Sequence, residues 1–256
     1  MEYPAGEVPS LGLSYPAGRR LLVQIGDSTE QVMDTCESPW CSTTVQYAFD
    51  GLRHRRSSDA AGANPIVILE RGFGLGIIAD YVFKKALDLH AVDYHVIELN
   101  RAVAKRAREW KAAKEAVLGG LFANLPEGEP SYSIHVHEGD AFEVTSGLLR
   151  EGKKFHIIIA DTYPLKGEEG VNDLADLETS KHLLAPDGVF TFFAYTPSNK
   201  AGGLAAAQRD LIAEHFREYS VIESPGVRPP PEYSYMWQDG LPVQRLMVVR
   251  CKKPRL

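Results

Sequence analysis

Residues 65–82 read PIVILERGFGLGIIADYV, and this stretch decides the fold. The apolar run at residues 65–70 is typical of a strand buried on both faces of a parallel sheet. The glycines at positions 72, 74 and 76 follow it, and glycine permits positive φ angles and a close approach of the backbone to a ligand. The residues behind the turn predict a helix. A strand, a glycine turn and a helix in this order form the first unit of an α/β fold.

The rest of the chain repeats this alternation. Strands are predicted at residues 94–99, 132–136, 155–160, 189–195, 219–222 and 245–251, with helices at 102–116, 173–184 and 204–216. This order indicates a Rossmann-like, doubly wound, mostly parallel sheet of seven strands with helices on both faces. The last strand follows a Pro-rich segment, and we expect it to run antiparallel at or near an edge of the sheet.

The first 60 residues differ from the rest of the chain. Residues 1–19 are rich in Pro and Gly and predict an extended arm. A short strand at 21–25 and a helix at 45–52 follow before a small polar loop. We therefore divide the chain into an N-terminal arm at residues 1–60 and a Rossmann-like domain at residues 61–256.

Composition narrows the class of protein. The 256 residues are 44% hydrophobic and 24% charged, which is ordinary for a globular chain. The net charge of −6 argues against a nucleic-acid partner. The sequence has neither a signal peptide nor an apolar run long enough to cross a membrane, so we expect a cytoplasmic monomer or homodimer without membrane contact. Three cysteines without paired spacing do not predict a disulfide framework.

Acidic residues mark the ends of the first two predicted strands. Glu70 precedes the glycine turn, whose G-x-G-x-G spacing differs from the dinucleotide fingerprint G-x-G-x-x-G. A carboxylate at this place repels a pyrophosphate and attracts an ammonium group, which disfavours an NAD oxidoreductase. Glu98 ends the second strand, where it can accept hydrogen bonds from the ribose hydroxyls of a nucleoside.

The next two strands also end in acids. Asp140 and Ala141 follow the third strand, where Asp140 can either bind an adenine amino group or cap the next helix. Asp161 follows the fourth strand. Ligands of open α/β sheets lie beyond the carboxyl ends of the strands, so Asp161 is expected at the same rim as Glu70 and Glu98.

Two histidines in the third predicted strand are a weaker signal. His135 and His137 alternate, so they point to one face with a spacing that can bind a metal. The sequence indicates no third ligand, and we expect no metal site.

Several stretches together resemble the family of guanidinoacetate N-methyltransferase and its arginine-methylating relatives. The family patterns LEVGFGM, IIE-N and YDTYPL are similar to ILERGFGLGIIADYV, VIELN and ADTYPL here, with GVFTFFAY as a similar fifth strand. The segment VMDTCESPW at residues 32–40 resembles the family's VMERWETPY, and PPPEYSY at residues 229–235 resembles a late loop with tyrosines. The resemblance spans about residues 32–253.

The resemblance implies a class I methyltransferase with S-adenosyl-L-methionine as cofactor. It assigns Glu70, Gly72, Gly74, Glu98, Asp140, Ala141 and Asp161 to the cofactor. It makes Glu37 and Asp161 the catalytic carboxylates that clamp and deprotonate the acceptor nitrogen. Tyr163, Tyr195 and Thr196 are implied as further contacts of a small guanidino substrate.

Some residues depart from the family pattern. Cys36 stands where the family has Trp, and Arg71 replaces an aliphatic residue beside the turn. The family's Leu-Trp near the adenine is not evident around Asp140, and the connection at residues 119–130 is longer. These changes leave the acceptor open: another amine of specialised metabolism is an alternative to a guanidino compound. An aminopropyl transferase is a more distant alternative, and a non-catalytic nucleoside-binding module belongs to a different class. We expect the N-terminal arm to act as a lid, because Glu37 has to reach the rim of the sheet.

Overall fold

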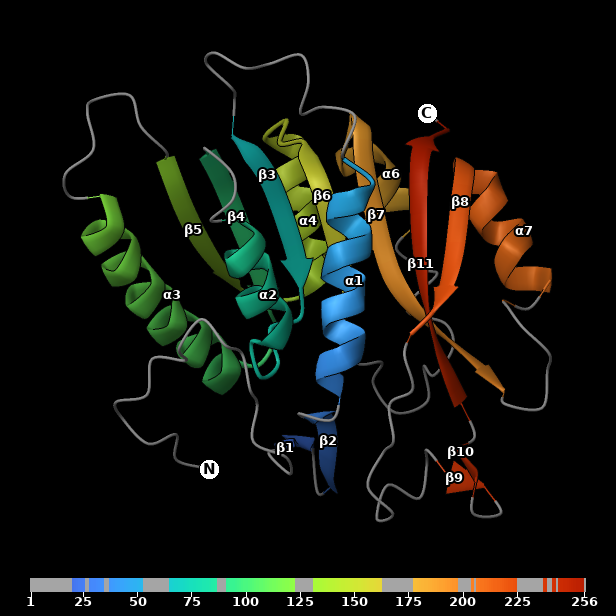
Figure 1. Cartoon of the computed structure of the whole chain (residues 1–256), viewed down its shortest axis with the longest axis horizontal. Coiled ribbons are helices and arrows are strands. Elements are labelled where there is room, and N and C mark those ends of the chain that lie inside the picture. The colour runs from blue at the N-terminus through green and yellow to red at the C-terminus, as the bar shows by residue number, and fades with distance from the viewer. Residues whose placement is uncertain are drawn as a thin grey trace.

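The fold is built on one sheet of seven strands (Figure 1). The computed structural model describes residues 20–25, 28–34, 37–52, 65–86, 91–122, 131–162, 177–197, 204, 206–224, 237–238, 241–242 and 244–255. The strand order is β5-β4-β3-β6-β7-β11-β8. The bounds are β3 (Ile66–Arg71), β4 (Ala91–Glu98), β5 (Ser131–Glu138), β6 (Phe155–Ala160), β7 (Leu184–Pro197), β8 (Phe216–Glu223) and β11 (Gln244–Pro254).

The strands pair as the alternation of strands and helices predicts. β3 is parallel to β4 and β6, β4 is parallel to β5, and β6 is parallel to β7. β11 is antiparallel to both of its neighbours, β7 and β8. The Rossmann-like, mostly parallel sheet is confirmed, and so is an antiparallel last strand beside the edge.

Helices cover both faces of the sheet (Figure 1). One face carries α1 (Ser38–Asp50), α2 (Ile77–Ala86) and α3 (Arg101–Phe122); the other carries α4 (Ala141–Arg150), α6 (Leu177–Leu183) and α7 (Ala206–His215). Outside the sheet, β1 (Arg20–Ile25) pairs with β2 (Ser28–Asp34), and β9 (Trp237–Gln238) pairs with β10 (Leu241–Pro242). None of the helices among the described residues has the length and apolar composition needed to cross a membrane.

The central strand β6 shows why both faces need a cover. Ile157 and Ile159 belong to the core under α1 and α2, whereas Phe155 and Ile158 belong to the core on the opposite face. All four are fully buried. Side chains alternate along a strand, so a strand between two helical layers has to be apolar throughout.

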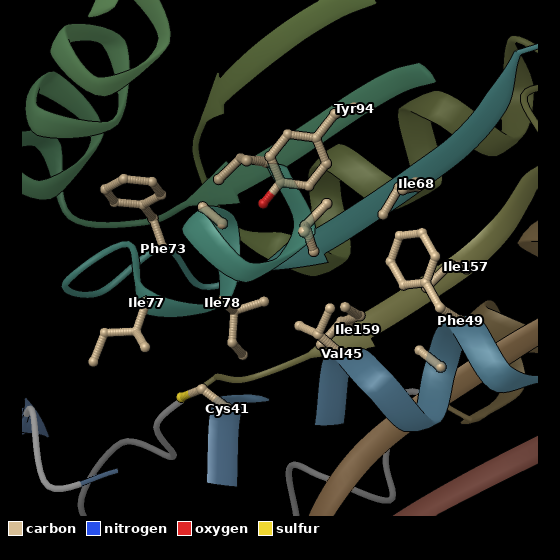
Figure 2. Close-up of a cluster of buried hydrophobic side chains, with 14 of the residues drawn as sticks. Cys41, Val45, Phe49, Ile68, Phe73, Ile77, Ile78, Tyr94, Ile157 and Ile159 are labelled. Carbon is tan, nitrogen blue, oxygen red and sulfur yellow. The ribbon is translucent and has the colours of Figure 1, made fainter. Parts of the chain in front are cut away.

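Helix α1 belongs to the same core as the sheet. Its Cys41, Val45 and Phe49 lie beside Ile157 and Ile159 of β6 (Figure 2). Residues 38–52 therefore share a core with the predicted domain of residues 61–256. The expected boundary at residue 60 lies outside the described residues.

Three element boundaries in the described part of the chain differ most from the prediction. Helix α1 begins at Ser38 rather than at residue 45, with a proline in its first turn, where the missing N–H costs no hydrogen bond. Helix α3 continues to Phe122 through Gly119 and Gly120, which we predicted as part of the connection. Strand β7 begins at Leu184 rather than at residue 189, so it includes residues 186–188, whose Pro-Asp-Gly sequence is typical of a turn.

Candidate functional site

The glycine turn joins the ends of three strands. Gly72, at φ 82°, is so close to β6 that an added Cβ would overlap the backbone carbonyl oxygen of Asp161. The Gly72 N–H donates to the carbonyl of Ile97 at 2.8 Å, and the Asp161 N–H donates to the carbonyl of Arg71 at 2.9 Å. Only glycine fits a place with positive φ and no room for a side chain. The ends of β3, β4 and β6 are thereby fixed at one point, as predicted.

The N-terminal hairpin of β1 and β2 contacts this turn. Met33 of β2 is buried, and its Sδ accepts the N–H of Leu75 at 3.1 Å. A Cβ on Gly74, whose φ is 54°, would lie 2.7 Å from the same sulfur. The turn is therefore covered by a residue that lies about 40 positions earlier in the chain.

Glu98 holds the backbone of the turn. Its Oε2 accepts the N–H of Phe73 at 2.9 Å and that of Gly74 at 3.4 Å, and its Oε1 accepts the N–H of Asn100 at 2.8 Å. A carboxylate oxygen has two lone pairs, so these bonds do not use the full acceptor capacity of the group. The predicted bond to a ribose stays a prediction.

Glu70 is fully buried at the end of β3. The hydroxyl of Tyr94 donates to its Oε2, whereas Oε1 has no hydrogen-bond partner among the described residues. Burial raises the pKa of the Glu70 carboxyl well above its usual range, and the charges of Asp161, Asp80 and Glu98 raise it further. The site thus holds a carboxyl group that lacks a countercharge able to offset its burial.

The charges of three acids, Glu37, Glu70 and Asp161, act on the thiol of Cys41. Burial raises the pKa of this thiol, and the charges of Asp161, Glu37 and Glu70 raise it further. Glu37 is the N-cap residue of α1, but its side chain does not cap the helix. Asp161 and Glu37 are both half-buried. The structure therefore places the two predicted catalytic residues in one acidic neighbourhood with Glu70.

Asp140 caps α4, as one of its two interpretations predicted. Its Oδ1 accepts the N–H groups of Phe142 at 2.8 Å and Glu143 at 3.2 Å. Gly139 donates its N–H to the carbonyl of Glu98 at 3.0 Å, so the cap lies beside the end of β4. Ala141 is the first residue of α4 and is half-buried. A contact of this pair with adenine stays a prediction.

The remaining predicted contacts are described only in part. Tyr163 lies outside the described residues. Tyr195 and Thr196 lie in β7, where they pair with Leu246 and Arg245 of β11. Their role in binding a substrate stays a prediction.

Three residues of this neighbourhood were not predicted from the sequence. Tyr94 bonds to Glu70, Cys41 lies among the acids, and Arg71 is buried on β3 with its guanidinium donating to Ser180 Oγ at 3.1 Å. Burial lowers the pKa of Arg71 to about 9. The period of two along β3 does indicate that Arg71 faces away from Glu70. The contacts themselves join residues far apart in the chain, and no local pattern shows them.

Comparison with known proteins yields similar structures only. No family model and no curated protein matches the sequence. The structure is similar to a SAM-dependent methyltransferase from Agrobacterium tumefaciens, with 12% identity, a TM-score of 0.48, and coverage of 94% of this chain and 72% of that one. It is also similar to precorrin-6y C5,15-methyltransferase from Geobacter metallireducens, with 13% identity, a TM-score of 0.47, and coverage of 82% and 87%.

A third similar structure is the N-methyltransferase NodS from Bradyrhizobium japonicum. The identity is 14%, the TM-score is 0.44, and the match covers 82% of this chain and 97% of that one. Identities this low say nothing about the substrate.

Proposed function

We propose that this chain is an S-adenosylmethionine-dependent methyltransferase that acts on a nitrogen of a small cationic molecule. The observation that carries the proposal is the buried carboxyl of Glu70, whose Oε1 has no hydrogen-bond partner among the described residues, beside a turn of glycines with positive φ. The charges of Glu37, Glu70 and Asp161 also act together on the buried thiol of Cys41. The cofactor contains a sulfonium and an ammonium group, and the acceptor is a cation. Clustered carboxylates favour both ligands electrostatically.

The residues around the turn fit this cofactor. Gly72 and Gly74 have positive φ and no room for a Cβ, so the turn packs closely against Asp161 and Met33 beside the buried carboxyl of Glu70. Glu70 Oε1 is buried without a hydrogen-bond partner among the described residues, and an ammonium group is the donor it lacks. Glu98 would hold the ribose, and Asp140 with Ala141 would lie near the adenine. When bound, the cofactor supplies an electrophilic methyl group on sulfur.

Glu37 and Asp161 would orient the acceptor. Two carboxylates can hold the N–H groups of a guanidinium by paired hydrogen bonds, which makes a guanidino compound the first candidate. The attacking nitrogen forms its bond to the methyl carbon as the sulfur–carbon bond breaks, and its proton passes to one of the two carboxylates. Because a free guanidinium has a pKa above about 12, the reaction needs such a proton acceptor. Tyr163, Tyr195 and Thr196 would contact the rest of the acceptor.

We also propose that the N-terminal arm at residues 1–60 completes the site. The contact of Met33 with the N–H of Leu75 and the position of Glu37 at the start of α1 support this assignment. Deleting residues 1–30 is expected to reduce turnover at least about tenfold, because β1 and part of β2 are lost and Met33 is released from the turn. Unchanged turnover of the shortened chain would contradict the proposal that the N-terminal arm acts as a lid over the site.

Calorimetric titration tests the proposed reaction. S-adenosylhomocysteine is titrated first, and in its presence a panel of guanidinoacetate, arginine and simple amines follows. We expect nucleoside binding and one guanidino ligand, whose affinity falls at least about 100-fold in Glu37→Gln and Asp161→Asn. The matched control is Glu143→Gln, which changes an exposed acid of α4. If only an amine binds, the acceptor is an amine rather than a guanidino compound. If the folded protein binds no S-adenosylhomocysteine, the proposal that the chain is a methyltransferase is refuted.

A further inference from the structure

Five polar side chains gather on the face of β4 and β5 that faces away from α3. In the register of these strands His95 is directly opposite His135, and Asp93 is directly opposite Ser133. His137 follows on the same face of β5, because side chains alternate along a strand. The His95 ring is stacked on the rings of His135 and His137, with centroids 4.5 and 5.2 Å apart.

Two of the distances within this group are those of ligands in one coordination shell. His95 Nε2 lies 3.2 Å from Asp93 Oδ1, and His135 Nε2 lies 3.0 Å from the same oxygen. One ligand atom from each of the three residues fits within 4.8 Å of the others. Bonds of about 2.0–2.1 Å in a tetrahedral zinc site put the ligand atoms about 3.3 Å apart. The three side chains therefore need little rearrangement to bind one ion.

His95 supplies a second, independent observation. Its side chain is 3% exposed, and its Nε2 makes no hydrogen bond of good geometry within the described part of the chain. Its other ring nitrogen, Nδ1, lies 3.0 Å from His137 Nε2. Metal-binding histidines commonly donate this second N–H to a neighbour, which orients the ring and leaves the other nitrogen with a free lone pair. His137 is placed to accept such a bond.

Both positively and negatively charged side chains lie near the group of Asp93, His95 and His135. Histidine binds a metal as the neutral imidazole, and Lys153, Ser133, Lys111 and Glu151 surround this group. Lys153 Nζ lies 3.3 Å from Asp93 Oδ2, the oxygen that does not face the histidines. Ser133 Oγ donates to Oδ1 at 2.8 Å. The positive charge of Lys111 also acts on His135, and the negative charge of Glu151 acts on His137.

We propose that Asp93 Oδ1, His95 Nε2 and His135 Nε2 form a binding site for a divalent transition metal of the zinc type, with His137 as the positioning residue of His95. Two imidazoles and a carboxylate suit zinc or cobalt, whereas magnesium and calcium prefer oxygen ligands alone. His135 is 45% exposed, so a fourth ligand from solvent can reach the ion. The ion would link the edge strand β5 to β4 on the face opposite to Tyr94 and Glu70, away from the proposed methyl-transfer site.

Titration of the metal-stripped full chain with Zn²⁺ and Co²⁺ tests the proposal. We expect one equivalent of metal to bind, visible absorption bands of Co²⁺ in low coordination, and a higher Tm with Zn²⁺. His135→Ala and Asp93→Asn should weaken binding at least about 100-fold, and His137→Gln about tenfold. His135→Ala is the main variant, because its exposed side chain can be removed without opening the core.

The matched control is His182→Ala. His182 is also exposed and also contacts a carboxylate, Glu178, at 3.1 Å. Removal of this side chain should leave the affinity and the Co²⁺ spectrum unchanged. The proposal is refuted if the wild-type chain binds no Zn²⁺ below millimolar concentration, or if His135→Ala binds it as tightly as the wild type. Both results are independent of methyltransferase activity.

Discussion

Glu70 on β3 and Asp93 on β4 are two carboxyl groups of the same sheet in opposite environments. Glu70 is fully buried, has one described donor, Tyr94, and is surrounded by other acids, so its pKa is raised. Burial also raises the pKa of Asp93, but the contact with His95, the hydrogen bond from Ser133 and the charge of Lys153 outweigh it and hold that pKa well below its usual range.

The two acids differ in their partners. Side chains of the same sheet stabilise the charge of Asp93, whereas the described residues do not stabilise that of Glu70. Asp93 receives hydrogen bonds from Ser133 and Lys153 and contacts His95 at 3.2 Å, so its charge contributes to the stability of the fold. Glu70 has Tyr94 as its one described donor and is fully buried, so its charge costs stability in the ligand-free chain. A perturbed pKa of this kind beside a glycine turn is a physical reason to look for a binding site there.

The largest effect is expected from the glycines beside these two acids. Gly72, two residues after Glu70, and Gly152, next to Lys153, both have positive φ, at 82° and 74°. A Cβ on Gly72 would overlap Asp161, whereas no heavy atom lies within 4 Å of one on Gly152. Gly72→Ala should therefore lower the free energy of unfolding by about 3 kcal/mol or more, and Gly152→Ala by about 1 kcal/mol. Urea unfolding measures both, and equal losses would show that crowding at the turn has no effect.

Neutral replacements of the two acids should change stability in opposite directions. The folded pKa of Glu70 is raised, so its cost appears as the pH rises above the unfolded value of about 4.5. Without ligand, Glu70→Gln should therefore be about 1 kcal/mol more stable than the wild type at pH 8. The folded pKa of Asp93 is lowered, so its contribution is present above about 3.8 and is lost as the pH falls. Asp93→Asn should be about 1–2 kcal/mol less stable at pH 8.

Urea titrations at pH 5 and pH 8 check both signs. The excess stability of Glu70→Gln should grow between the two pH values, while the deficit of Asp93→Asn should stay nearly constant because both lie above its titration range. A loss of stability in both variants at pH 8 would mean that Glu70 is as well satisfied as Asp93.

The smallest effect is expected from one donor of Asp93. Ser133→Ala removes the bond from Ser133 Oγ to Asp93 Oδ1, which spans 2.8 Å. The other donors remain, so the free energy of unfolding should fall by about 0.5–1 kcal/mol, and acid unfolding should begin at a slightly higher pH. Ser146→Ala, at an exposed position of α4, is the control and should change neither quantity. An equal loss of stability in Ser146→Ala would show that the hydrogen bond from Ser133 to Asp93 makes no specific contribution.

Local patterns of the sequence predicted the frame of the fold. The apolar run before the glycine turn is β3, and the strands at 155–160 and 245–251 lie where β6 and β11 are. The patterns failed where distant contacts decide. Residues 186–188 have the composition of a turn and lie within β7 where its register to β6 shifts, between the pairs Phe155–Leu184 and Ile157–Val189. Gly119 and Gly120 weaken a helix, yet α3 continues through them.

Local sequence patterns predicted the candidate sites only in part, again because contacts between distant residues decide the rest. An acid at a strand end can be read from the sequence, so Glu70, Glu98 and Asp161 were found together with the turn. The group of Asp93, His95 and His135 depends on the register between β4 and β5, and a shift by one residue would separate it. Cys41 was missed for the same reason, because only the packing of α1 places it among acids from other elements.

The position of β11 has a consequence for synthesis on the ribosome. β11 lies between β7 and β8, although it follows both in the chain. A nascent chain that has emerged only to residue 240 therefore has one half of the sheet ending in an unpaired β7 and a separate β8 without a neighbour. We expect the sheet to close only after Pro254 has left the exit tunnel. Until then the open edge of β7 is a surface for a chaperone to protect.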